Sequence, residues 1–170
     1  MSITLDGSNV STIGVINSGT AQNTTSGTSI DFTGIPAGVK RIVVMFDGVS
    51  TSGSSIIQIQ LGTSGGIVNS GYVGNAASCG NGGTWTLVAA TSGFYTEGTG
   101  APTFTRNGIA IITNISGNIW TYSGNFAIAT SVSCVAGGGV TLGAVLDRTR
   151  ITTVNGTDTF DAGSVNIQYE

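Results

Sequence analysis

Apolar and polar residues alternate with a period of two along most of the chain. In the stretch IIQIQLG, apolar side chains alternate with Gln58 and Gln60, which is the pattern of a strand with one face toward a core. No window of a dozen residues shows apolar positions at the i, i+3, i+4 and i+7 spacing of a helix without Gly, Ser or Thr interrupting it. The pattern therefore predicts strands almost everywhere.

Short β-branched or aromatic stretches recur with turn residues between them, which favours an antiparallel sandwich or barrel over a parallel sheet with helical crossovers. The predicted strands cover residues 11–16, 29–33, 41–46, 55–61, 67–73, 84–89, 93–96, 109–114, 119–130, 132–136, 146–154 and 164–169. Turns are predicted at residues 47–50, 63–66, 114–118 and 154–158, and the glycines within residues 136–140 are predicted to form a loop. We therefore predict an all-β fold, a jelly-roll-like antiparallel β-sandwich without significant helix.

Residues 42–46 are apolar at both parities, which predicts a central strand with the core on one face and a neighbouring subunit or a covering loop on the other. In the next strand, Gln58 and Gln60 are expected to point outward. Uncharged amides on that face would allow close approach by another chain without burying a charge. A solvated outer face explains the two glutamines equally well.

The length of 170 residues predicts one compact domain. Residues 28–170 are expected to form the sandwich, while residues 1–27, the least apolar part, are expected to be an N-terminal arm or an extra edge strand. The longest purely apolar run is far shorter than the roughly 20 residues of a membrane span, so no membrane insertion is expected. The first residues also lack the basic and apolar regions of a secretory signal, which predicts synthesis in a cytosol.

Charge is scarce in this sequence. Only 8% of residues are charged, against roughly 25% in an average soluble domain. With a net charge of −3 and five cationic residues, the chain lacks the basic surface that binds nucleic acid. Because surface charge keeps proteins apart, a surface with so little of it favours assembly into something larger.

The sequence offers little material for catalysis. It contains no histidine, which removes the commonest general base and metal ligand. Asp158 and Asp161 are close enough in sequence to suggest a catalytic pair or part of a calcium site, but such residues are usually turn-makers that cap backbone N–H groups. Cys79 and Cys134 are expected to be free thiols in a reducing compartment. We therefore predict no catalytic, cofactor-binding or metal-binding residue, and no enzyme.

The aromatic residues Trp85, Tyr95, Trp120 and Tyr122 are candidates for contacts with a glycan or with another subunit. An exposed aromatic ring can stack on the apolar face of a sugar. The parity of the sequence places Trp120 and Tyr122 on the same face of one strand, together with Phe126. That face is most simply a core or an interface, and glycan binding remains the alternative.

Two stretches, SIDFTGIPAGVKRIVVMFDGVSTSGSSIIQIQLG at residues 29–62 and LDRTRITTVNGTDTFDAGSVNIQYE at residues 146–170, resemble a family of tailed-bacteriophage virion proteins. These are tail-fibre or tail-fibre-like proteins, and the opening MSITLDGSNVSTIGV is similar to the start of phage fibre proteins. The resemblance covers about a third of the chain and consists of framework strands, so it assigns no functional residue.

The resemblance implies a non-enzymatic virion protein made in the bacterial host cytoplasm without a signal peptide. Its partners would be further copies of the chain, as a homotrimer, and a capsid or tail protein. It would act as a tail fibre, a fibre tip or a capsid-decoration protein. The alternative is a receptor-binding module that engages host-surface polysaccharide through Trp85, Tyr95 or loop asparagines. Gln58, Gln60 and the four aromatic residues together are the candidate contacts, with a glycan or with another subunit.

Overall fold

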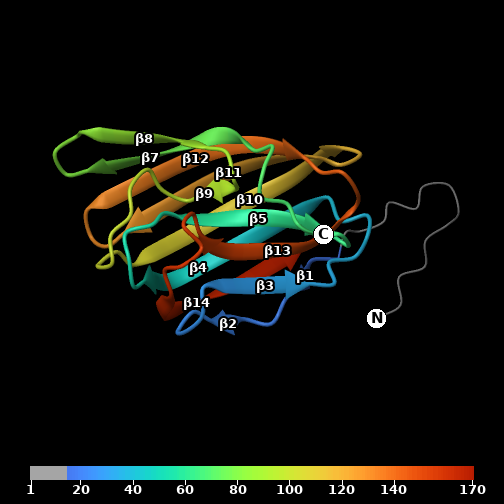
Figure 1. Cartoon of the computed structure of the whole chain (residues 1–170), viewed down its shortest axis with the longest axis horizontal. Coiled ribbons are helices and arrows are strands. Elements are labelled where there is room, and N and C mark those ends of the chain that lie inside the picture. Colours follow the sequence, from blue (N-terminus) through green and yellow to red (C-terminus); the bar gives the residue numbers. More distant parts are fainter. Residues whose placement is uncertain (1–14) are drawn as a thin grey trace, which may run out of the picture.

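The computed structural model describes residues 15–170, which form two antiparallel sheets packed face to face (Figure 1). No helix occurs among these residues. The predicted antiparallel β-sandwich is therefore confirmed. The smaller sheet lies in front of the larger one in Figure 1. The β7–β8 hairpin forms the edge of the larger sheet opposite β1.

The larger sheet has nine strands, and β2 joins it by pairing with β14. Its main path runs β1 (Asn17–Ser18), β14 (Phe160–Tyr169), β4 (Arg41–Thr51), β10 (Arg106–Ser116), β11 (Ile119–Ile128), β12 (Val132–Thr141), β7 (Val73–Gly80) and β8 (Trp85–Ala90), with β2 spanning Gln22–Asn23. The predicted central strand is β4, which lies between β14 and β10 as expected for a strand that is apolar at both parities.

The smaller sheet has five strands. Its path runs β3 (Ser29–Thr33), β13 (Leu146–Thr153), β5 (Ile57–Thr63) and β6 (Gly66–Ile67), and β9 (Phe94–Tyr95) pairs with β5. The bounds of β3 match the prediction. Because β9 follows β8 of the larger sheet and precedes β10 of the same sheet, residues 91–105 cross to the smaller sheet and return. We call these residues the crossing segment.

The core between the sheets is built from alternating side chains. In β11 every second residue is buried, so Trp120, Tyr122 and Phe126 share the inner face, as their parity predicted. Phe94 of the crossing segment stacks on Tyr122 with ring centroids 4.7 Å apart. Phe94 also meets Tyr72 edge-to-face at 5.0 Å. These aromatic contacts fasten the crossing segment to β11 of the larger sheet and to the chain between β6 and β7.

The prediction of a loop at residues 136–140 is wrong, because the triple glycine lies inside β12. Gly138 pairs with Tyr122 on one side and with Gly74 on the other. A Cβ atom on Gly74 would lie 2.9 Å from the Cα atom of Gly138, which is closer than such atoms approach in proteins. Glycine is therefore required here by close backbone contact rather than by a turn.

Two further predictions of local structure are also wrong. Residues 67–73 do not form one strand, because only Gly66–Ile67 pairs with β5. The chain then turns at Gly71, where φ is near +80°, and β7 begins at Val73. The turn predicted at residues 47–50 is instead a bulged part of β4, where Gly48 has φ near +63°. Glycines in these stretches allow bulges and left-handed backbone as well as hairpin turns.

The described part of residues 1–27 lies along one edge of the larger sheet. β1 pairs with the end of β14, and β2 pairs with its middle. The predicted strand at residues 11–16 lies mostly outside the described residues, and its last two residues, Val15 and Ile16, belong to no strand.

The buried tyrosines predict a loss of stability at alkaline pH. Burial raises the pKa of Tyr72 from its ordinary value of 10 to about 12, although the N–H of Leu61 partly opposes this shift. Burial also raises the pKa of Tyr122, and the nearby Glu97 adds to that rise. In the unfolded chain both phenols ionise near pH 10, so above that pH the folded state holds protons that the unfolded state has lost.

Stability that is fully present below pH 10 should therefore fall as the pH rises from 10 to about 12. Urea unfolding at a series of alkaline pH values, with absorbance at 295 nm to follow phenolate, measures this decline. We expect a shallower decline in Tyr72→Phe. An identical slope in Y72F and the unchanged protein would contradict the assignment to Tyr72.

Candidate functional site

The outer face of the larger sheet is broad and uncharged. We call the outward side chains of β10, β11, β12, β7 and β8 the broad face, and none of them carries a charge. Eight large apolar residues are exposed on it: Val73, Trp85, Leu87, Ile109, Ile111, Ile115, Ile119 and Val135. Arg41, the first residue of the neighbouring β4, and Asp47, in the middle of that strand, are the nearest charges in its outward positions.

Cross-strand pairing arranges the broad face in continuous rows, because paired residues point to the same side of a sheet. One row, starting on β4, runs Met45, Ile109, Asn125, Val135, Ala77 and Leu87. The next runs Val43, Ile111, Ser123, Gly137, Asn75 and Ala89. Both rows combine large apolar, small and short polar side chains, and none of them is charged.

The strand β8 forms one edge of this face. It pairs with β7 on one side, and no described strand pairs with its other side. Its sequence WTLVAA contains no Lys, Pro or other residue that natural edge strands use to block pairing with a further chain. Trp85 and Leu87 are 57% and 68% exposed on the broad face beside this edge. Apolar side chains and an unpaired backbone edge are therefore next to each other.

The four aromatic candidates separate into two groups. Trp85 is exposed on the broad face. Tyr95, Trp120 and Tyr122 are buried, and the hydroxyl of Tyr122 donates to the carbonyl of Tyr95 at 3.0 Å. These three residues therefore pack within the protein, and Trp85 alone of the four offers most of its ring to a partner.

The two glutamines are placed on the face that their parity predicts, but the expected exposure is wrong. Gln58 and Gln60 point away from the core, yet only 3% and 6% of their surface is exposed. Ser92 of the crossing segment lies over them: its hydroxyl donates to Gln58 Oε1 at 2.8 Å, and its carbonyl accepts from Gln60 Nε2 at 2.9 Å. Their amides are therefore bound to the chain itself and form the floor of a polar depression.

The paired carboxylates are engaged in local structure. Asp158 caps a backbone N–H, as predicted for a turn-maker, by accepting from Ser55 at 2.9 Å, and it also accepts from Asn155 at 2.7 Å. Asp161 lies in β14 and accepts from the hydroxyl of Ser50. Within residues 15–170, no group of three or more His, Cys, Asp or Glu side chains gathers in a metal-binding arrangement.

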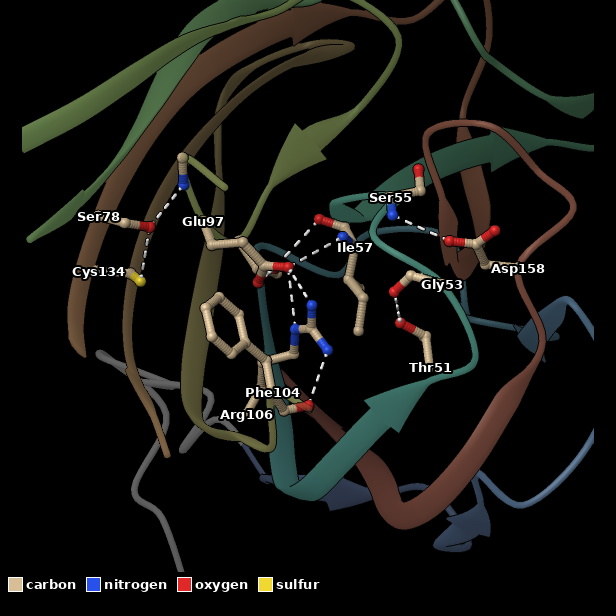
Figure 2. A network of polar contacts seen from close by, with 12 residues as sticks. Thr51, Gly53, Ser55, Ile57, Ser78, Glu97, Phe104, Arg106, Cys134 and Asp158 are labelled. Carbon is tan, nitrogen blue, oxygen red and sulfur yellow. Dashed lines mark hydrogen bonds and ion pairs between the residues drawn. The ribbon is translucent and has the colours of Figure 1, made fainter. Parts of the chain in front are cut away.

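A buried ion pair that was not predicted from the sequence holds the crossing segment (Figure 2). Arg106 and Glu97 have fully buried side chains, and Arg106 Nη2 lies 2.7 Å from Glu97 Oε1. Glu97 also accepts from the N–H of Ile57 at 3.3 Å and from the hydroxyl of Thr96 at 2.5 Å. One signal for this pair is present in the sequence. Glu97 and Arg106 carry opposite charges nine residues apart, on either side of a turn, in a chain with few charged residues.

The two cysteines are free, as expected. Cys79 pairs with Ser133, whereas Cys134 pairs with Ser78, so the two thiols point to opposite faces of the larger sheet. Burial raises the pKa of the Cys134 thiol, which lies 3.1 Å from the Ser78 hydroxyl. That same hydroxyl accepts from the N–H of Gly98 at 2.8 Å and so helps to hold the crossing segment.

Comparison of the chain with models of protein families, with curated proteins and with solved structures found no match. No helix within residues 15–170 has the length and apolar character needed to span a membrane.

Proposed function

We propose that this protein is a non-enzymatic structural component of a tailed-phage virion, a tail fibre, fibre tip or capsid-decoration protein that docks and self-associates through the broad face. The broad face carries the proposal: five neighbouring strands present eight exposed large apolar residues and no charge. The resemblance of residues 29–62 and 146–170 to phage virion proteins supplies the biological setting.

The physical support is the composition of this face. The core of a protein interface is depleted in charged residues, and exposed apolar surface of this extent commonly marks an interaction site. Two copies can bring neutral faces together without repulsion, although each whole chain carries a net charge of −3. The unblocked edge of β8 adds backbone donors and acceptors for a further strand.

Assembly can be tested by placing charge on the broad face. We expect the unchanged protein to sediment as an oligomer, a trimer, at micromolar concentration, and to be incorporated into particles assembled with the phage's own proteins. Ile109→Lys combined with Val135→Lys should yield a folded monomer that is not incorporated, because each lysine would have to lose its water at the interface. Both side chains are about half-exposed, so the fold should tolerate the change.

The matched control is Thr33→Lys, an exposed outward position on the smaller sheet, which should assemble normally. A monomeric, unincorporated wild-type protein would refute the proposal, as would a double variant that assembles as well as its control. Binding of host-surface polysaccharide is the second candidate function, and the polar depression over Gln58 and Gln60 favours it.

A further inference from the structure

The smaller sheet carries a polar groove on its outer face, on the opposite side of the sandwich from the broad face. The groove has a volume of about 300 Å³. Its floor is made by the outward side chains of two paired strands: Gln58 and Gln60 of β5, and Arg150 and Thr152 of β13. The walls are Ser92 of the crossing segment, Asn69 after β6, residues 28–29 and the turn at residues 153–156.

The floor is held in place by hydrogen bonds to the surrounding chain. Gln58 Nε2 donates to the carbonyl of Thr153 at 3.2 Å, and Gln58 Oε1 accepts from Ser92. The hydroxyl of Thr152 donates to the carbonyl of Thr28 at 2.8 Å. Polar groups fixed in this way lose little conformational entropy when a ligand binds.

Some polar atoms of the groove have no partner among the described residues. Only 6% of Gln60 is exposed, yet its Oε1 atom accepts no hydrogen bond from the described residues. Gln60 lines the groove. The second proton on Gln60 Nε2 is likewise not used by Ser92. Asn69, on the wall, is exposed and its amide makes no side-chain hydrogen bond within residues 15–170. Donors and acceptors are therefore both available.

The groove is electrically neutral. Arg150 is the only charged residue among those that line it, and its Nε and Nη2 atoms donate to the two carboxylate oxygens of Asp31, each at 2.7 Å. The pairing with Asp31 raises the pKa of Arg150 and keeps the guanidinium charged and paired. The site therefore has no free charge to attract an ionic ligand, and Nη1 of Arg150 remains as a further donor.

We propose that this groove binds a neutral sugar unit. A hydroxyl group both donates and accepts hydrogen bonds, so a ligand bearing several hydroxyls matches fixed amides that offer both functions side by side. The volume lies at the lower end of the roughly 300–1,000 Å³ found for small-molecule sites, which suits one or two sugar rings. The inference deepens the second candidate function, and it does not depend on assembly through the broad face.

The affinity of a single groove is set by its chemistry. No aromatic side chain lines the groove, so the stacking contribution to sugar binding is absent. Binding then relies on hydrogen bonds that replace those to water and gain only about 0.5–1.5 kcal/mol each. A dissociation constant in the millimolar range, about 1 mM or weaker, is therefore expected for one sugar unit.

Nuclear magnetic resonance of the full chain tests the proposal. The protein is titrated with glucose, galactose, mannose and N-acetylglucosamine, and with glucuronate as a charged probe, while amide signals are followed. At least one neutral sugar should shift the side-chain amide signals of Gln58, Gln60 and Asn69, with no gain for glucuronate. Asn69→Ala should weaken that binding about three- to tenfold, because one hydrogen bond is removed.

Gln60→Leu should weaken binding by more than tenfold, about the loss expected for two hydrogen bonds. The matched control is Asn23→Ala, an exposed asparagine in β2 on the other sheet, which should bind like the unchanged protein. If Q60L fails to fold, the comparison of sugar affinity between N69A and N23A tests the proposal. Absence of shifts with every neutral sugar, shifts on another surface, or equal affinity in N69A and N23A would each overturn the proposal. Because N69A leaves the broad face unchanged, the oligomeric state of N69A tests the proposed assembly separately from sugar binding.

Discussion

Replacing Arg106 with methionine is expected to lower the free energy of unfolding by about 3–5 kcal/mol, because Glu97 would be left as an uncompensated charge in the interior. Both side chains are fully buried, so water cannot replace the lost guanidinium. Glu97 also holds the N–H of Ile57 in β5, and a shift of its carboxylate would loosen the crossing segment where it joins the smaller sheet. Urea unfolding followed by tryptophan fluorescence measures the loss.

Two further variants isolate the charge from the loss of packing. The double variant Arg106→Met with Glu97→Gln should recover much of the stability, since the amide oxygen can still accept from Ile57 while the charge is gone. Arg41→Met serves as the exposed control, because its ion pair with Glu170 lies at the surface, and it should cost at most about 1 kcal/mol. Equal losses in R106M and in the double variant would contradict this account.

The second large effect is expected at Gly98, the residue after Glu97. A Cβ atom there would overlap the carbonyl oxygen of Thr86 and lie 2.9 Å from the N atom of Ser78. These are backbone atoms of β8 and β7, so a rotamer change cannot relieve the overlap. Gly98→Ala should therefore destabilise the protein by about 1–3 kcal/mol or more, as overpacking does in other cores.

Thermal unfolding measures the effect of Gly98→Ala, with Gly80→Ala as its control. Nothing lies within 4 Å of a Cβ atom built on Gly80, so that variant should remain within about 0.5 kcal/mol of the unchanged protein. A normal melting temperature in G98A would show that the crossing segment can move away from β7 and β8 without cost.

The parts of the fold that the sequence predicts well are those set by neighbouring residues. Alternation correctly placed Trp120 and Tyr122 on the inner face of β11, and the apolar run in residues 42–46 correctly indicated an interior strand. Alternation also gave the correct direction for Gln58 and Gln60. In each case the period of the strand decides the outcome, and that period can be read from a few consecutive residues.

The features that the sequence did not predict depend on contacts between distant segments. The burial of Gln60 is caused by Ser92, 32 residues further along the chain. Glycine at Gly138 in β12 is required by the close approach of Gly74, which no local pattern records. The extent of the broad face could not be predicted either. Its rows of side chains cross from β12 to β7, and these two strands are neighbours in the sheet but not in the sequence.

The opposition of the two outer faces has a consequence for how copies would act together. A protomer that docks through the broad face leaves the groove of its smaller sheet on the side away from the contact. An array of docked copies would then present many identical grooves to one repeating polymer. Once one groove is occupied, its neighbours meet the next repeats at a local concentration far above that in solution, so weak individual sites yield strong avidity.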